Sequence, residues 1–159
     1  MDIVLDTCCV AALTRGTQNS RDDLVTKLVH RKGLRVVVDR GTALIDEWKK
    51  TVSPEIVQAL VVKWSDDGGL VQVRKDCKMP KDLARELQRL SFTDTCDKLI
   101  VRIAIGTTDR TIVSNDSDFW DPKDSTRQGD ATAPVAVALD KHENIRIMTL
   151  NQLKQNSSL

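Results

Sequence analysis

The sequence lacks several features that would place it in a well-marked class. No apolar run is long enough to span a bilayer, and the N-terminal MDIVLD has neither the basic segment nor the long apolar stretch of a signal peptide. Only seven glycines and four prolines occur in 159 residues, while 40% of the residues are hydrophobic and 30% are charged. This composition excludes a low-complexity chain. We expect a folded cytoplasmic protein without a membrane segment.

Cysteine and histidine motifs are also missing. No CxxC spacing links the four cysteines, which are Cys8, Cys9, Cys77 and Cys96. The two histidines, His30 and His142, stand alone. No zinc site is therefore indicated, and reduced, mostly buried thiols are the favoured interpretation.

The chain has almost no net charge, with a formal value of +1. A protein that holds nucleic acid by electrostatics alone is usually much more basic. Any contact with nucleic acid is therefore expected to be local or brief.

Short apolar runs predict a set of strands. Residues 3–5, 35–38 and 111–113 are rich in β-branched side chains without clean alternation, which is typical of strands covered on both faces. Residues 70–73 and 145–148 predict two further strands nearer an edge of the sheet.

Helical patterns lie between these strands. One covers residues 20–31, a second begins at Ser53 and Pro54 and ends near Trp64, and a third covers 80–89. Another is predicted to begin near Asp97 and to continue to Gly106.

Because strands and helices alternate, we predict a single α/β domain, a three-layer α/β/α sandwich around a mainly parallel sheet of about five strands. The domain is expected to span residues 1–153, followed by a frayed tail at 154–159. Residues 121–134 combine Pro, Gly, Ser and Thr with charges and predict a surface loop. A lid, a partner contact and a plain insertion all stay open for this loop.

Two strands deliver an acid to the same edge of the predicted sheet. Asp6 directly follows 3–5, and Asp116 comes three residues after 111–113. Open α/β sheets bind ligands at the carboxyl ends of their strands. These two carboxylates are therefore candidates for a site.

Helices supply two more candidate acids. Glu47 borders the apolar stripe of its helix, whereas Asp46 is expected on a solvated face with Lys49 and Lys50 at i+3 and i+4. Asp97 opens a helix whose next residues are nearly all apolar, so its carboxylate should lie in a partly enclosed place.

A purely structural role stays open for each acid taken singly. Asp94 and Asp97 are suited to capping a helix, Asp39 to a turn, and Asp116 and Asp118 to a turn before the loop. Together, however, several carboxylates at one edge repel one another and require cations or protons. Hard divalent ions such as Mg²⁺ or Mn²⁺ prefer these oxygen ligands.

Four segments resemble, in order, the acidic motifs of PIN-domain nucleases over about residues 2–153: IVLDTCCVAAL, VVVDRGTALIDEW, DTCDKLIVRIAI and TIVSNDSDFW. That family is a single α/β domain with a central parallel sheet. The resemblance implies a catalytic and metal-binding quartet of Asp6, Glu47, Asp97 and Asp116.

The resemblance also assigns supporting residues. Ser114 matches a hydroxyl residue that orients a ligand, and Thr7 matches the residue that usually follows the first acid. Asp118 is a candidate further metal ligand, because an extended chain returns it to the side of Asp116. Asp94, one helical turn before Asp97, is another. Where the family often has Asn, this chain has Cys8, so the local hydrogen bonding must differ.

The activity implied is that of a Mg²⁺- or Mn²⁺-dependent endoribonuclease that leaves a 5′-phosphate and a 3′-hydroxyl, with single-stranded DNA open as a substrate. Many small PIN proteins are toxins inhibited by an antitoxin, and many form homodimers. The alternative is a noncatalytic PIN-like module that binds RNA or a protein partner. The candidate contacts to phosphates are Arg15, Arg40, Lys49 and Lys50.

Overall fold

A computed structural model describes residues 1–15, 33–73 and 77–156. Within these ranges a five-stranded, all-parallel sheet has the order β3-β2-β1-β4-β5. The strands are β1 (Asp2–Leu5), β2 (Arg35–Val38), β3 (Leu70–Gln72), β4 (Thr111–Val113) and β5 (Arg146–Met148). All five predicted strands are confirmed, and the two expected nearer an edge, β3 and β5, are the outer strands. The helix predicted at 20–31 lies outside the described residues.

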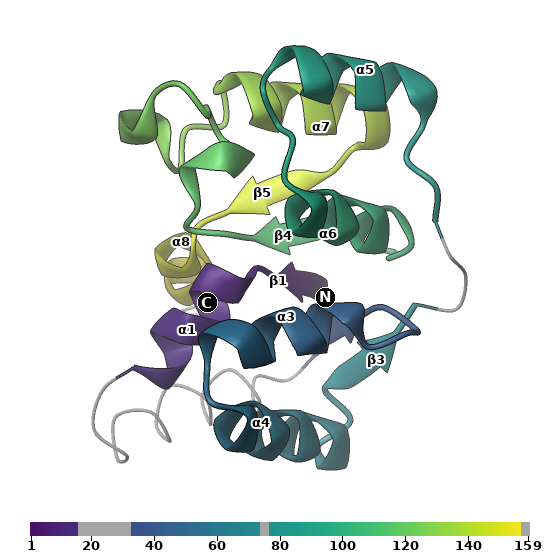
Figure 1. Cartoon of the computed structure of the whole chain (residues 1–159), viewed down its shortest axis with the longest axis vertical. Coiled ribbons are helices and arrows are strands. Elements are labelled where there is room, and N and C mark those ends of the chain that lie inside the picture. The colour runs from purple at the N-terminus through teal and green to yellow at the C-terminus, as the bar shows by residue number, and fades with distance from the viewer. Residues whose placement is uncertain (16–32, 74–76, 157–159) are drawn as a thin grey trace.

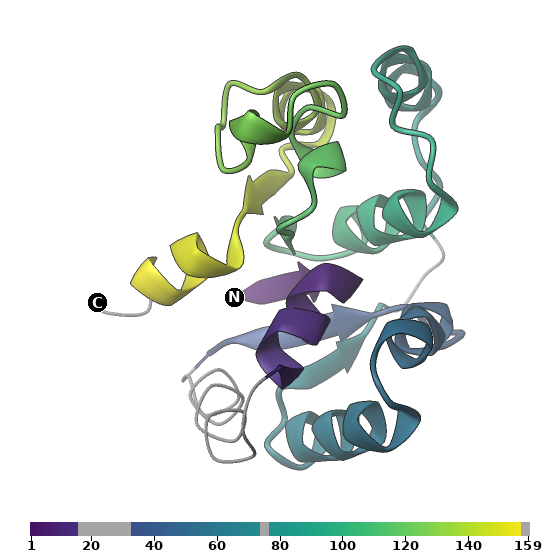
Figure 2. The same cartoon turned by 60° about the vertical axis from the view of Figure 1, so that its left-hand side comes forward.

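Helices cover both faces of the sheet (Figures 1 and 2), so the predicted α/β/α sandwich is confirmed. Helix α6 packs against β1 and β4, α4 against β3, and α7 against β5, while α3 contacts α1, α4 and α6. The described α-helices are α1 (Thr7–Thr14), α3 (Ala43–Thr51), α4 (Pro54–Asp66), α5 (Lys81–Arg89), α6 (Thr95–Ile105), α7 (Pro134–Glu143) and α8 (Leu150–Gln155). In the part of the chain that the structure describes, no helix has the length and apolar character needed to cross a bilayer.

The strand order reverses direction at β1. From β1 the chain moves outward to β2 and β3, then returns to the other side of β1 for β4 and β5. In open α/β sheets such a reversal point is where ligands commonly bind, at the carboxyl ends of the two central strands. The Asp6 amide donates to the Val113 carbonyl at 3.0 Å, so β1 and β4 stay paired up to the residue that follows β1.

Helix starts are fixed by side-chain caps. Ser53 Oγ accepts from the Ile56 amide at the start of α4, as the sequence predicts. At α6 the cap is Asp94, whose Oδ1 accepts from the amides of Cys96 at 2.8 Å and Asp97 at 3.2 Å. The helix thus begins at Thr95, two residues before the predicted start near Asp97, because Asp94 supplies the capping oxygen.

Aromatic contacts fix two segments near the carboxyl edge. Trp48 and Trp64 meet edge to face at 6.3 Å and join α3 to α4. Phe92 and Phe119 meet at 5.2 Å, and Phe119 and Trp120 are both buried, so these two side chains pack in the core. The short 3₁₀ helix η1 (Ser117–Phe119) is thus anchored to the core directly after β4.

The predicted loop at 121–134 is held by its own contacts and includes a second 3₁₀ turn, η2 (Ser125–Arg127). The Arg127 guanidinium bridges Asp121 and Asp130, and Gln128 Nε2 donates to the Asn115 carbonyl. The loop therefore borders the segment that follows β4. Helix α8 extends to Gln155, two residues beyond the predicted limit of the domain at 153.

Candidate active site

Five carboxylates gather at the carboxyl ends of β1 and β4, and we call this group the acidic edge. One directly follows β1, two lie at or in η1 after β4, and two come from the start of α6. The acidic edge consists of Asp6, Asp94, Asp97, Asp116 and Asp118. The structure thus places three of the four predicted quartet members, together with both additional candidate ligands, at one position.

Asp97 is the electrostatic centre of this group. Only 7% of the residue is exposed. Burial first, and then the charges of the other four members of the acidic edge, together raise the pKa of Asp97 to about 8. No lysine, arginine or histidine among the described residues forms an ion pair with any of the five carboxylates. The negative charge is therefore uncompensated in this part of the chain.

Asp6 is buried and is held by two side chains. Its Oδ2 accepts from Ser114 Oγ at 2.6 Å and from Cys8 Sγ at 3.1 Å. Burial raises the pKa of Asp6 despite these hydrogen bonds. Ser114 Oγ also accepts from the Asp116 amide at 2.9 Å, so this hydroxyl connects two of the carboxylate residues.

Asp116 and Asp118 share a turn after β4. Asp116 Oδ1 accepts from the Asp118 amide at 3.0 Å and caps η1. The extended backbone predicted for Asp118 is therefore wrong, because residues 117–119 form a 3₁₀ turn. Asp118 still reaches the acidic edge: burial raises its pKa, and the neighbouring charge of Asp116 adds to the effect.

Glu47 lies at the margin of the acidic edge. Its carboxylate forms an ion pair with Lys50, and 33% of the side chain is exposed. Asp46 is exposed on α3, as expected, but among the described residues no ion pair joins it to Lys49 or Lys50, since Lys50 pairs with Glu47. Glu47 is connected to the other acids through Cys96, whose thiol is close enough to feel the charges of Glu47, Asp6 and Asp97.

Two thiols belong to the site, of which the family resemblance singles out Cys8 but not Cys96. Burial and the surrounding carboxylates raise the pKa of Cys96 to about 11. Cys8 Sγ donates to Asp6 and accepts from the Asn115 amide at 3.3 Å, so this thiol links the residue after β1 to the segment after β4. The sequence does contain a signal for these thiols, because Cys8 lies two residues after Asp6 and Cys96 directly precedes Asp97.

The residues of the acidic edge suit a hard divalent cation in their chemistry. They offer carboxylate oxygens without a compensating cation among the described residues, and the buried Thr7 Oγ1 lies beside the Cys96 thiol. As the side chains stand, no three Asp, Glu, His or Cys groups of the described residues form a ready metal site. Mg²⁺ requires fewer protein ligands than such a group provides, because proteins commonly hold it by one or two carboxylates and substrate phosphates.

The four predicted phosphate contacts differ in their surroundings. Arg15, directly after α1, and Arg40, before α3, are exposed. Lys49 is half-buried on α3, and Lys50 is committed to Glu47. Arg15, Arg40 and Lys49 stay predictions, whereas Lys50 would have to leave its partner to meet a phosphate.

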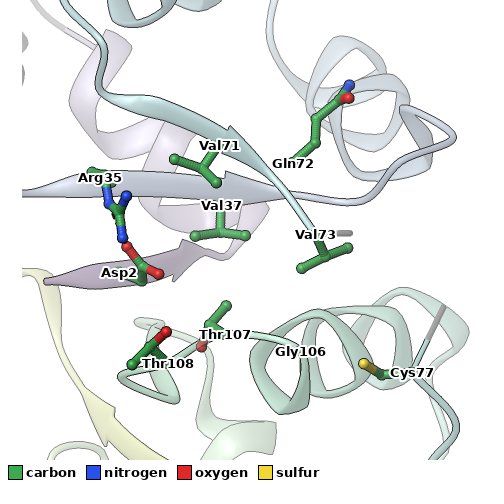
Figure 3. A pocket seen from close by; sticks show the side chains of 10 residues that line it. All are labelled: Asp2, Arg35, Val37, Val71, Gln72, Val73, Cys77, Gly106, Thr107 and Thr108. Atoms are coloured by element: carbon green, nitrogen blue, oxygen red, sulfur yellow. Dashed lines mark hydrogen bonds and ion pairs between the residues drawn. The ribbon is translucent and has the colours of Figure 1, made fainter. Parts of the chain in front are cut away.

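A pocket of about 450 Å³ lies away from the acidic edge, beside the C-terminal end of α6 (Figure 3). Val37 and Val71 line it from the sheet, with Cys77 toward one end. At the other end Arg35 Nε donates to Asp2 Oδ1 at 2.7 Å. Because these two charges are paired with each other, the pocket offers less chemistry than the acidic edge.

Comparisons with known proteins add no family. The chain matches no protein-family model, no curated protein and no solved structure.

Proposed function

We propose that the acidic edge is the active site of a Mg²⁺- or Mn²⁺-dependent endoribonuclease of the PIN type. The observation that carries the proposal is Asp97, a buried acid with a pKa of about 8 beside four other carboxylates and no described cation. Such a group is costly unless a cation joins it, and it lies at the switch point of the sheet, where open α/β folds bind ligands.

The chain's own residues have separable roles in this proposal. Asp6, Asp97 and Asp116 would hold the cation, with Asp94 and Asp118 nearby and Glu47 at the margin. Ser114 fixes the Asp6 carboxylate relative to the backbone of Asp116. When bound, a divalent cation supplies charge neutralisation at a phosphate and acidifies water. This chemistry matches phosphodiester hydrolysis.

The experiment is cleavage of end-labelled RNA by the purified chain with Mg²⁺ or Mn²⁺. We expect the wild type to release products with a 5′-phosphate and a 3′-hydroxyl. Asp6→Asn and Asp116→Asn should reduce the rate by at least about a hundredfold, because each removes a charge from the cation site. Asp140→Asn, an exposed change on α7, is the matched control and should cut normally.

Two results would contradict the proposal: a wild-type chain that cuts no RNA, or Asn variants that cut as fast as the wild type. A parallel assay with single-stranded DNA of the same sequence decides between the two substrates. Faster cleavage of the DNA would assign the activity to DNA instead.

The alternative of a noncatalytic RNA- or protein-binding module has one observation in its favour. Glu47 is neutralised by Lys50, and the described side chains do not converge into a three-ligand metal group. This alternative predicts that the chain binds RNA or a protein with an affinity that divalent ions do not change. It also predicts that bound RNA is not cleaved.

We further propose that the protein is cytoplasmic and forms homodimers. As a toxin, it would be inhibited by an antitoxin segment that lies over the acidic edge. The dimer and antitoxin proposals are supported only by the family resemblance. Sedimentation velocity tests the dimer, and a monomer at micromolar concentration would contradict it. A small upstream reading frame encoding a DNA-binding protein would support the toxin role.

A further inference from the structure

A groove between α5 and α6 begins beside the acidic edge. It has a volume of about 350 Å³. Thr95, the first residue of α6, lines one part of it and directly follows the capping Asp94. Figure 1 shows α5 and α6 as separate neighbouring helices, with the chain between them leading into the start of α6. The groove therefore runs along α6, and the start of this helix supplies two of the five carboxylates, Asp94 and Asp97.

Two cations line the α6 side of this groove. Thr95, Lys98 and Arg102 follow one another at i, i+3 and i+7, so they form one stripe along the helix. Seven residues of helix rise span about 10 Å. The stripe thus leads away from the acidic edge for a distance suited to consecutive backbone phosphates.

The two cations have no described acidic partner. Neither Lys98 nor Arg102 forms an ion pair with a residue in the described ranges, and no acid lines the groove. Like charges at i and i+4 destabilise an isolated helix slightly. The acids of α5 are used elsewhere, since Asp82 pairs with Arg85 and Glu86 with Arg89.

The opposite wall of the groove is mostly apolar. It is formed by Met79, Ala84 and Leu87, of which Leu87 is buried and the other two are half-buried, together with the exposed Gln88. An apolar wall beside a row of cations suits a single nucleic acid strand, whose sugars and bases contact the wall while its phosphates meet the cations. Without an aromatic residue in the lining, the contact would depend little on sequence.

We propose that the groove between α5 and α6 binds the phosphate backbone of single-stranded RNA through Lys98 and Arg102 and leads it to the acidic edge. This proposal rests on the proposed nuclease function for its direction, but its binding test needs no cleavage. The occupant is a polyanionic strand, because the described residues that line the groove carry two positive charges and no negative one.

The test is fluorescence anisotropy of a labelled single-stranded RNA with the full chain in EDTA, at salt concentrations from about 50 to 200 mM. Each lost phosphate contact lowers the slope of log affinity against log salt by about 0.7 for a single strand. The double variant Lys98→Gln/Arg102→Gln should therefore bind at least about tenfold more weakly at low salt and lose about 1.4 from the slope. Lys98→Arg/Arg102→Lys should keep both values.

Arg146→Gln is the matched control. Arg146 is exposed at the start of β5, at the amino end of the sheet, so the loss of one positive charge there should leave affinity and slope unchanged. Equal melting temperatures of all variants establish that folding is intact.

An unchanged affinity and slope in the double variant would overturn the groove proposal even if the wild type cuts RNA. An equal loss in Arg146→Gln would overturn it as well, because the effect would then be one of net charge. So would a poly-glutamate peptide that competes as well as RNA of equal length. Weaker binding by the double variant alone supports the groove whether or not the wild type cuts RNA, so the nuclease proposal can fail separately.

Discussion

Ser114 Oγ lies 2.6 Å from Asp6 Oδ2 and joins the ends of β4 and β1 by one buried hydrogen bond. The same oxygen accepts from the Asp116 amide. Ser114 itself is fully buried. This hydroxyl therefore links the Asp6 carboxylate directly to the backbone of Asp116, beside the Asp6–Val113 backbone bond and the contacts of the Cys8 thiol.

Ser114→Ala should lower the free energy of unfolding by about 1 to 3 kcal/mol, because it leaves a buried carboxyl and an amide without this partner. Urea denaturation measures the change. Ser65→Ala, an exposed change on α4, is the control and should stay within about 0.5 kcal/mol of the wild type. Equal unfolding free energies for Ser114→Ala and the wild type would show that the hydroxyl does not support the site.

Asp97 should make the metal-free protein less stable as the pH rises. Its folded-state pKa is about 8, against an ordinary value of 3.8. Between these values the folded chain keeps a proton that the unfolded chain has released, so raising the pH favours unfolding until about pH 8. Asp97→Asn removes the contribution of Asp97 to this dependence, while the raised pKa values of Asp6 and Asp118 keep theirs.

In EDTA, the melting temperature of Asp97→Asn should exceed that of the wild type by roughly 5 °C at pH 8, with a much smaller difference at pH 4. Differential scanning calorimetry over this range measures both. Asp140→Asn on the surface of α7 should follow the wild-type curve. A constant difference between Asp97→Asn and the wild type at all pH values would contradict the assigned shift.

Cys8 should tolerate serine better than an apolar residue. Its thiol donates to Asp6 and accepts from the Asn115 amide, and a hydroxyl can do both. Thermal unfolding should place Cys8→Ser within about 1 kcal/mol of the wild type and Cys8→Val about 1 to 2 kcal/mol lower. Identical stabilities of the two variants would mean that the thiol acts only by its volume.

Arg127 should control the order of the 121–134 loop. It bridges Asp121 and Asp130, and its guanidinium also helps to lower the pKa of Asp130 to about 2, after the hydrogen bonds from Thr132. Arg127→Gln should speed hydrogen exchange of the loop amides by about tenfold, which corresponds to a loss of about 1.4 kcal/mol. Lys123→Gln, an exposed charge change in the same loop, is the control, and equal exchange in both variants would contradict this role.

The strands were predictable because each is a short β-branched run, and the carboxyl-edge positions of Asp6 and Asp116 followed from them. The strand order was not predictable in the same way, since it depends on long-range pairing that the local pattern does not encode. That order brings the acids after β1 and β4 together at the switch point.

Local ambiguities account for the wrong predictions. Lys50 can reach an acid at either i−4 or i−3 on its helix, and only the packing of α3 selects Glu47 over Asp46. Asp94 and Asp97 are equally suited to a cap by residue type, and the turn before α6 decides for Asp94. The place of Cys96 among the acids arises only when α3 and α6 meet.

The central claim is that the acidic edge binds a divalent cation, and equilibrium titration with Mn²⁺, followed by the electron paramagnetic resonance of the free ion, tests it most directly. We predict saturable binding by the wild type, an affinity at least about tenfold weaker in Asp6→Asn and Ser114→Ala, and no change in Asp140→Asn. Wild-type Mn²⁺ binding that equals that of Asp6→Asn would contradict the claim.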